Sequence, residues 1–469
     1  MKKIIALLLA VLMVATLFAG CANGKDEVVT LKWVTVGGGM PANYEAWQEN
    51  INKYLEEKIG VHLDVEVISW GDWDQRRNLI VSTGEVYDIM FTNNGTYAND
   101  VNMGAFLDIT EMVKTSAPEL VKFVPEAYWN ACKIDGKLYA VPTYKDSSAT
   151  QYFCWDKAKV EASFPEYADA HSLADIDEGI RKVSADNNEP IFYLSKGGFD
   201  LIPRLYDDLS AGLPALGVSY DDASVTVVPV LEQANVQDEL SYVRAWYNDG
   251  IINSDAAILA ENPSYRPMFV AQGWPMAAQT SWGPGMGVEA VAVQYGDTVL
   301  SNSTVQGSMN CISAASKNPE KALELLQLVN TDSYVRDALY FGLEGDNFTY
   351  TEDGKVHKNN NDWTMAGYTQ GTFFIVSMQD TETANQWDEV KALNEQAKPS
   401  PALGFNFNTA PVADELAACK AIWEENKAQL MTGSADPETL IPEIMQQMRD
   451  SGFDKIIAEA QSQIDAWKK

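Results

Sequence analysis

Aromatic side chains with carboxylates or amides beside them recur along the sequence, and this combination is typical of sites that bind sugars. The chain contains 13 Trp, 20 Tyr and 16 Phe residues. A flat ring covers the apolar C–H face of a sugar, while carboxylates and amides form hydrogen bonds with its hydroxyl groups. Several such residues lie where predicted strands end, and these are the candidate ligand-binding residues. They are Trp70, Asp72, Asn93, Tyr97, Tyr144, Asp146, Trp282 and Trp363.

Catalytic chemistry has much weaker support in the sequence. A glycosidase requires two carboxylates that flank the scissile bond, but among 66 acidic residues a pair can always be found. The histidines His62, His171 and His357 form no HExxH spacing, and no GxSxG elbow is present. Residues 186–189 carry oxygen ligands suited to calcium, yet they lack the EF-hand order and are more typical of a polar turn. We therefore predict no catalytic residue, no metal and no cofactor.

Strands and helices alternate over the first part of the chain. The pattern predicts strands at residues 28–36, 61–69 and 87–91, with helices between them. This spacing is typical of βαβ units and predicts a mostly parallel sheet, in which ligands gather at the carboxyl ends of the strands. The triple glycine at 37–39 lacks the spacing of a phosphate loop, so we expect it to form a tight turn.

Residues 135–155 have the pattern of a chain that leaves one lobe and enters another. A short β-rich run at 138–141 is closed by Pro142, and an aromatic run at 152–155 precedes a helix start. The residues between them, 143–150, are small and polar and too few to form an element. We predict an interlobe crossing here, and a hairpin within one domain is the alternative.

Six motifs follow one another along the chain in an order that is more specific than any one of them. They are YDIMFTN (87–93), GAFLDIT (104–110), DGKLYAVP (135–142), WYNDGIINSD (246–255), MFVAQGWPMAAQTSWG (268–283) and SKNPEKALELL (316–326). This series resembles the family 1 extracellular solute-binding proteins of ABC importers. The resemblance implies a two-lobe α/β fold of the type II periplasmic-binding-protein kind, with a mainly parallel sheet flanked by helices in each lobe and a ligand cleft between the lobes. It also implies that the ring of Trp282 faces a sugar.

The domain organisation follows from the crossing and from the resemblance. The run YFGLEGDNFTYTEDGKV (340–356) is similar to a turn of a long, lipoprotein-type subgroup that ends in an extra C-terminal module. The predicted ranges are 1–20 for a signal peptide, 21–27 for a linker, 28–143 for the first part of lobe 1, 144–305 for the first part of lobe 2, 306–342 for the return to lobe 1, and 343–469 for the completion of lobe 2 with a C-terminal helical module.

The N-terminus has the pattern of an export signal. Lys2 and Lys3 are followed by an apolar run at 4–18 that is too short for a permanent membrane span. The ending Phe-Ala-Gly-Cys resembles a bacterial lipobox, which implies a lipid on Cys21. We therefore expect the protein on the extracytoplasmic face of the bacterial cell membrane, held there by lipid only. A conventional signal cleaved nearby is the alternative.

Charge and cysteine content narrow the possible partners. The formal net charge of −32 repels phosphate backbones, so nucleic acid is not an expected partner. Four further cysteines, Cys132, Cys154, Cys311 and Cys419, allow three complete pairings and match no zinc spacing. We expect them to be buried free thiols, because a domain of this size does not need disulfides.

These observations predict a binding protein rather than an enzyme. We expect a monomeric lipoprotein that captures a sugar or short oligosaccharide between two lobes and delivers it to an ABC permease. The resemblance supplies the substrate class and the permease, whereas the periodicity supplies only the lobes. An extracellular glycosidase and a peptide-binding lipoprotein are the alternatives.

Overall fold

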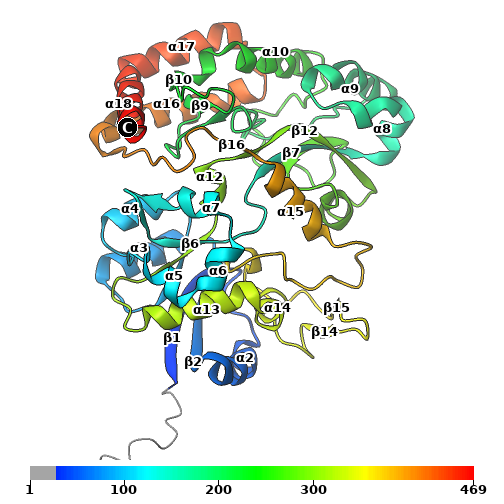
Figure 1. Ribbon diagram of the computed structural model, residues 1–469. Helices are drawn as coiled ribbons and strands as arrows, with labels where there is room; N and C mark the ends of the chain where they lie inside the picture. The colour runs from blue at the N-terminus through cyan, green and yellow to red at the C-terminus, as the bar shows by residue number, and fades with distance from the viewer. Residues whose placement is uncertain (1–27) are drawn as a thin grey trace, which may run out of the picture.

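A computed structural model places residues 28–469 in two lobes, which are stacked one above the other in Figure 1. Each lobe has its own large hydrophobic core, and the predicted two-lobe α/β class is confirmed. The expected signal peptide 1–20, the lipid-bearing Cys21 and the linker 21–27 lie outside the described residues. Within residues 28–469, no helix is both long and apolar enough to cross a bilayer.

The first lobe is built on a five-stranded sheet with the strand order β2-β1-β3-β13-β6. β1 is parallel to β2 and to β3, as the βαβ spacing predicts. β13 is antiparallel to both of its neighbours, because it enters this sheet on the way back from the second lobe. The strands are β1 (Val29–Gly37), β2 (Val61–Ser69), β3 (Ile89–Thr92), β6 (Ala140–Pro142) and β13 (Met309–Ile312).

Helices cover this sheet, so its strands carry apolar side chains on both faces. The helices are α2 (Tyr44–Ile59), α3 (Trp73–Thr83), α4 (Tyr97–Asn102), α5 (Met112–Ser116), α6 (Pro118–Phe123), α7 (Glu126–Ala131), α13 (Pro319–Thr331) and α14 (Ser333–Phe341). α2 ends at Gly60, whose φ of 65° is a left-handed conformation that glycine adopts without strain. α13 begins at Pro319, where the missing N–H costs no helical hydrogen bond.

The second lobe has a four-stranded sheet with the order β11-β7-β12-β16. The expectation of a mainly parallel sheet in each lobe is wrong here: β7 is antiparallel to both β11 and β12, and only β12 and β16 are parallel. The βαβ spacing belongs to residues 28–91 alone. In the second lobe β7 runs away from the crossing, and β11 and β12 return toward it. The strands are β7 (Ala149–Asp156), β11 (Met268–Gln272), β12 (Ala290–Leu300) and β16 (Lys398–Pro399).

The helices of the second lobe come from two distant parts of the sequence. The earlier part contributes α8 (Lys157–Ser163), α9 (Leu173–Asn187) and α10 (Ala234–Asn248), together with the short strands β8 (Tyr206–Asp207), β9 (Leu216–Ser219) and β10 (Val228–Pro229). The C-terminal part contributes α16 (Ala413–Met431), α17 (Pro437–Asp450) and α18 (Phe453–Trp467).

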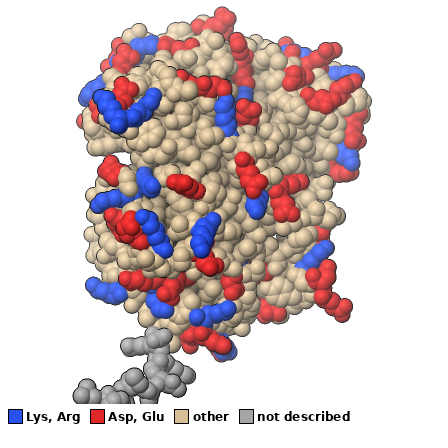
Figure 2. Space-filling view, viewed as in Figure 1, with Lys and Arg blue, Asp and Glu red and all other residues tan. Residues whose placement is uncertain are grey.

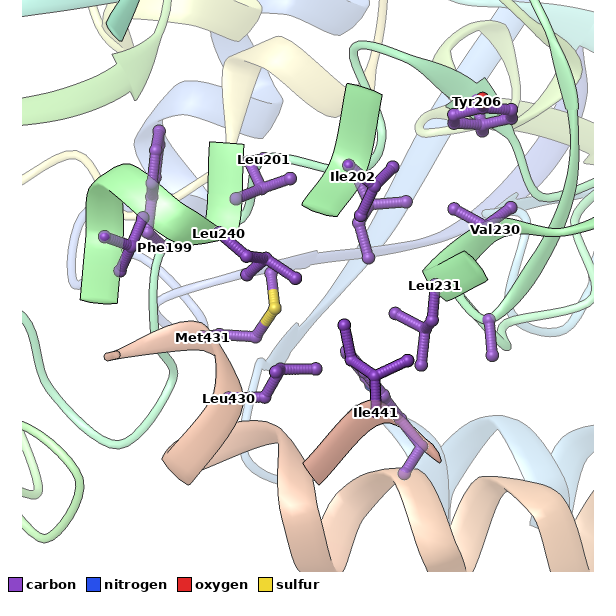
Figure 3. Packing of buried hydrophobic residues seen from close by; sticks show 14 of the residues in the cluster. Phe199, Leu201, Ile202, Tyr206, Val230, Leu231, Leu240, Leu430, Met431 and Ile441 are labelled. Atoms are coloured by element: carbon purple, nitrogen blue, oxygen red, sulfur yellow. The ribbon is translucent and has the colours of Figure 1, made fainter. Parts of the chain in front are cut away.

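The C-terminal helices do not form a core of their own. Figure 3 shows Leu430 and Met431 beside Leu201 and Leu240, and all four belong to the same buried cluster. Contact is so close at Gly198 that a Cβ there would lie 2.3 Å from the Cβ of Met431. The C-terminal helices and the rest of the second lobe therefore share one continuous core.

A small third cluster lies beside α14, on the right in Figure 1. It joins the hairpin β14 (Phe348–Tyr350) and β15 (Val356–Lys358) to α15 (Gln386–Gln396). The range 343–469, expected to complete the second lobe, therefore divides: Met365 belongs to the core of the first lobe, whereas the fully buried apolar residues from Ala402 onward belong to that of the second.

Chain segments cross between the lobes at residues 143–148, 301–308 and 370–397. The first crossing follows β6 directly and leads into β7. The third leaves the first lobe after the short 3-10 helix at Gly367–Thr369 and enters the second through α15 and β16. These segments are the only places where residues 28–469 pass from one of the two main sheets to the other.

The four cysteines of the described chain, Cys132, Cys154, Cys311 and Cys419, are free and buried. The prediction of buried thiols is confirmed. Burial raises the pKa of the Cys154 thiol to about 12, which keeps it protonated at neutral pH.

The shared core makes a testable prediction about α16. Leu430 is 1% exposed between the C-terminal helices and the second lobe. We expect Leu430→Ala to reduce the free energy of unfolding by about 2–5 kcal/mol and to speed amide hydrogen exchange in β7. Glu425→Ala, an exposed position on the same helix, serves as the matched control and should leave both unchanged. Faster exchange confined to α16–α18 would show instead that these helices unfold as a separate unit.

Candidate functional site

An exposed aromatic pair lies at the carboxyl end of β2. Trp70 follows this strand and is 47% exposed, and its ring is almost parallel to that of Tyr368, with centroids 6.4 Å apart and planes inclined by 10°. Phe91 of β3 meets the Trp70 ring edge-on at 5.9 Å. Burial raises the pKa of Tyr368, and the negative charge of Asp146 adds to the rise. The pair therefore presents a flat apolar surface with a hydroxyl close by, and Asp146, which is itself paired with Lys145, acts on that hydroxyl through its charge.

A polar cavity of about 290 Å³ lies between the lobes. The first lobe reaches it through Asn94, in the loop after β3, and the second through the ends of β7 and β11 and the residues 200–208. The crossing residues 301–304 complete the wall. A site with walls from both lobes changes shape when the lobes move, and its size is near the lower end of the range for small-molecule sites.

Side-chain amides line this cavity from both lobes. Gln151 and Gln272 lie directly opposite one another on β7 and β11. The side chain of Gln272 donates a long hydrogen bond of 3.4 Å to the carbonyl of Ser148. The backbone N–H of Asn94 donates to the carbonyl of Gln306 at 2.8 Å, which fixes the position of this residue. Each amide supplies a donor and an acceptor, which is the pairing that sugar hydroxyls require.

Three carboxylates, Asp200, Asp207 and Asp208, also line the cavity. Asp208 accepts hydrogen bonds from the N–H groups of Ser210 and Gly212, at 3.1 and 3.0 Å. Burial raises the pKa of Asp207 to about 6, since water is removed from its charged form and the neighbouring Asp208 is negative. Burial likewise raises the pKa of Asp200, again with a contribution from Asp208.

Arg204 is the cationic residue of this cavity wall, and its charge is already balanced. It forms an ion pair with Glu239, and its guanidinium lies over the ring of Tyr295, 4.0 Å from the ring centroid. The hydroxyl of Tyr295 donates to the same Glu239 carboxylate. The cavity therefore keeps a surplus of negative charge.

A larger groove of about 760 Å³ lies between α18 and the hairpin formed by β4 (Lys133–Ile134) and β5 (Lys137–Leu138). Trp467, which is 43% exposed, forms part of its wall. Figure 2 shows the molecule hollowed at its left margin between the lobes, and acidic side chains are spread over both lobes of the face shown. This groove is the rival position for a ligand.

The structure distributes the predicted site residues over different environments. Trp70 and Asp146 lie by Tyr368, as described above. Asp72 is exposed next to Trp70 and accepts a hydrogen bond of 2.6 Å from the hydroxyl of Ser69. Asn93 precedes the cavity residue Asn94. These four positions remain accessible to a ligand.

Three other predicted residues pack in the interior instead. Tyr97 is fully buried and donates to the carbonyl of Cys132 at 2.6 Å. Tyr144 is 5% exposed in a cluster of aromatic rings. Trp363 is half-buried and donates to the carbonyl of Leu339 at 3.0 Å. Their aromatic type is accounted for by packing, so they do not enter the proposed site.

Trp282 occupies an intermediate position on the second lobe. Its ring lies 6.1 Å from those of Tyr152 and Phe269, and it is half-buried in a small cluster on the face of the sheet opposite the main core. The ring edge also touches Gly273, where a Cβ would lie 2.6 Å away. Trp282 does not line the cavity that contains Asn94.

Sequence reasoning missed Gln151, Asp200, Arg204, Asp208 and Gln272. Gln151 and Gln272 are ordinary polar positions on strands, and residues 200–208 belong to an irregular stretch without periodicity. Only the aspartate pair of the run RLYDD would have attracted notice. Aromatic residues gave the stronger signal, although several of them serve the core.

Two lobes joined by crossing segments, with a polar cavity between them, define a two-lobe solute-binding protein. The family model of bacterial extracellular solute-binding proteins matches residues 37–336, and the chain belongs to this family. A domain of unknown function matches residues 401–469, which include α16–α18. A curated relative, the carbohydrate ABC transporter substrate-binding protein of Streptococcus pneumoniae serotype 4 strain TIGR4, is 27% identical over 473 residues, which cover 95% of this chain and 92% of the relative.

Solved structures of an S. pneumoniae protein show the same architecture. The N-glycan transport solute-binding protein NgtS matches with a TM-score of 0.85 and 26% identity, covering 93% of this chain and 98% of that chain. Its complex with Man5GlcNAc matches with a TM-score of 0.71 at 26% identity, over 94% and 98% of the two chains. By TM-score this chain is more similar to the first of these two structures than to the complex.

The buried carboxyl of Asp207 makes stability depend on pH. Its folded-state pKa of about 6 exceeds the usual value near 4, so the folded protein holds a proton that the unfolded chain has lost, and stability falls as pH rises from about 4 to 6. We expect Asp207→Asn to be more stable than wild type at pH 7, by up to about 3 kcal/mol. Urea unfolding of both proteins at pH 4 and at pH 7 checks this prediction. The difference in the free energy of unfolding should vanish near pH 4, and equal stabilities at pH 7 would contradict the prediction.

Proposed function

We propose that this chain is the extracytoplasmic substrate-binding component of an ABC importer and captures an oligosaccharide between its lobes. The observation that carries the proposal is the cavity whose amide groups come from both lobes, Asn94 from the first and Gln151 and Gln272 from the second. A ligand that forms hydrogen bonds with both sides favours closure, because closure brings all of these groups within reach of it.

The comparisons support a glycan as the ligand. NgtS is described as an N-glycan transport protein and has been solved with Man1GlcNAc and with Man5GlcNAc. The curated relative is a carbohydrate ABC transporter protein. Mannose- and N-acetylglucosamine-containing oligosaccharides are therefore the first ligands to test on this chain.

The Trp70–Tyr368 pair is the proposed stacking surface of the first lobe. It remains exposed in a conformation that is closer to the NgtS structure with the higher TM-score than to the glycan complexes. Closure of the second lobe over a bound sugar would remove this apolar surface from water and thereby add to affinity. Trp282 is proposed as a secondary contact on the second lobe, reached only after its half-buried ring adjusts.

The rest of the assembly follows from the family and from the sequence. We propose a monomer held at the outer face of the membrane by a lipid on Cys21, with residues 21–27 as a flexible spacer. The closed form would present its surface to the permease subunits. The lobes are proposed to comprise residues 28–143 and 306–342 on one side and 144–305 with the C-terminal helices on the other.

Ligand-induced stabilisation distinguishes this function from the alternatives. We expect Man5GlcNAc to raise the melting temperature of a protein comprising residues 28–469, because a ligand that binds only the folded state stabilises it. Short peptides should leave the melting temperature unchanged. The recovered glycan should be intact, with no new reducing ends. A shift with peptides alone would favour a peptide-binding protein, and release of reducing sugar would favour a glycosidase.

Two exposed tryptophans locate the ligand. We expect Trp70→Ala to weaken glycan binding by about 1–3 kcal/mol, as with other aromatic stacking platforms, and to change stability little because the ring is 47% exposed. Trp467→Ala removes a similarly exposed ring from the groove beside α18 and is the matched control. Calorimetry with both variants decides the question: loss of affinity only in Trp467→Ala would move the site to that groove.

A further inference from the structure

Asp200 differs from the other carboxylates of the interlobe cavity in having no protein partner. Among the described residues its side chain forms no hydrogen bond and no ion pair, whereas Asp208 is held by two backbone N–H groups and Asp207 accepts the N–H of Leu209 at 2.9 Å. Both of its oxygens are therefore available to a ligand in the cavity.

The backbone that carries Asp200 is fixed by the core on both sides. Phe199 is 3% exposed and Leu201 is fully buried, and Figure 3 shows both in the core shared with the C-terminal helices. The N–H of Phe199 donates to the carbonyl of Met431 at 2.8 Å. The backbone of Asp200, between two anchored neighbours, is therefore in place before the ligand arrives, so little backbone entropy is lost on binding, while its exposed carboxylate is free to meet the ligand.

The charges facing Asp200 leave it without a counterion of its own. Asp208 acts on it as a like charge, and Asp207 lines the same wall. The positive charge of Lys427 lowers the pKa of Asp200, but this lysine is paired with Glu424 at 2.6 Å. Arg204 of the cavity wall is paired with Glu239. Negative charge is therefore in surplus among the residues that line the cavity beside Asp200.

We propose that Asp200 is a specificity-determining residue that accepts hydrogen bonds from sugar hydroxyls and excludes acidic sugars from the site. Hydroxyl donors satisfy an ionised carboxylate without bringing charge into the cavity. A uronate carboxyl would face three aspartates, while Arg204 of the same wall is already paired with Glu239, and like charges at short range repel. The substrate class is accordingly neutral glycans. This inference rests on the proposed function of the same cavity.

The affinity of the site should also depend on pH in a defined direction. Hydroxyl donors favour the ionised form of Asp200 and so lower its pKa when ligand binds. Affinity for a neutral glycan therefore rises as pH increases through the titration of this carboxyl and becomes constant above it. An asparagine at this position cannot titrate, so the variant should lose this part of the pH dependence.

Calorimetry on three proteins tests the proposal, namely wild type, Asp200→Asn and Asp186→Asn. The last removes the same charge from an exposed position of α9 that lines no part of the cavity. The probes are Man5GlcNAc and a linear oligogalacturonate of similar length, measured at pH 5 and pH 7. We expect wild type and Asp186→Asn to bind the neutral glycan alike and much more tightly than the uronate. Asp200→Asn should bind the neutral glycan about ten- to hundredfold more weakly and show a smaller rise between the two pH values, since Asp207 still titrates there.

The outcomes separate this inference from the proposed function. Neutral-glycan affinity of Asp200→Asn within twofold of wild type would overturn the role of Asp200, while the protein remained a glycan-binding protein. Wild type binding the uronate as tightly as the neutral glycan would overturn the selection against acidic sugars. Wild type binding neither probe, nor other neutral oligosaccharides in the thermal-shift experiment, would overturn the proposed function and this inference with it.

Discussion

The segments that cross between the lobes are held together by a buried network of hydrogen bonds. Asn310 of β13 donates to the carbonyl of Thr369 at 3.0 Å and accepts from the indole N–H of Trp33 at 3.2 Å. The hydroxyl of Ser308 lies 3.1 Å from that of Thr143 and 3.3 Å from the carbonyl of Thr369. One cluster of side chains therefore ties the first, second and third crossings to β1. Buried backbone groups that leave a sheet need such partners, because an unsatisfied one would cost about 1–3 kcal/mol.

The third crossing is held to the first lobe by a second device. Arg336 of α14 is fully buried, and its guanidinium donates to the carbonyls of Gly367 and Thr372, both at 2.6 Å. Burial lowers its pKa to about 10, so it still carries its charge at neutral pH. The segment up to Thr372 therefore moves with the first lobe. Beyond it, Asn394 of α15 accepts from the backbone N–H and the hydroxyl of Ser148 and ties the third crossing to the first. A bend in the third crossing would therefore fall between Thr372 and Asn394.

Sequence patterns predicted the parts of this arrangement that have a regular spacing of apolar residues or a proline or glycine that ends an element. The parallel strands β1, β2 and β3 follow from βαβ spacing, and the first crossing follows from a short strand closed by Pro142. The antiparallel sheet of the second lobe could not be predicted, because a strand such as β7 has the same composition whichever way its neighbours run. The site was harder still. Tyr97 and Trp70 are both aromatic residues with polar neighbours in the sequence. Only three-dimensional packing makes the first interior and the second exposed.

The C-terminal helices pack in the second lobe, and the segment that precedes them also contacts the first. Because α16–α18 share a core with that lobe, any rotation of it must carry them along. The segment that leads into them also touches the first lobe: Asn406 donates to the carbonyl of Lys133, and Gln306 of the second crossing donates to both Asn406 and the carbonyl of Ala131. Through Asn406 these contacts join the C-terminal segment to the first lobe, so a rotation of one lobe against the other would have to shear or break them. A region matched by a family model of unknown function thus includes a residue, Asn406, that joins the two lobes.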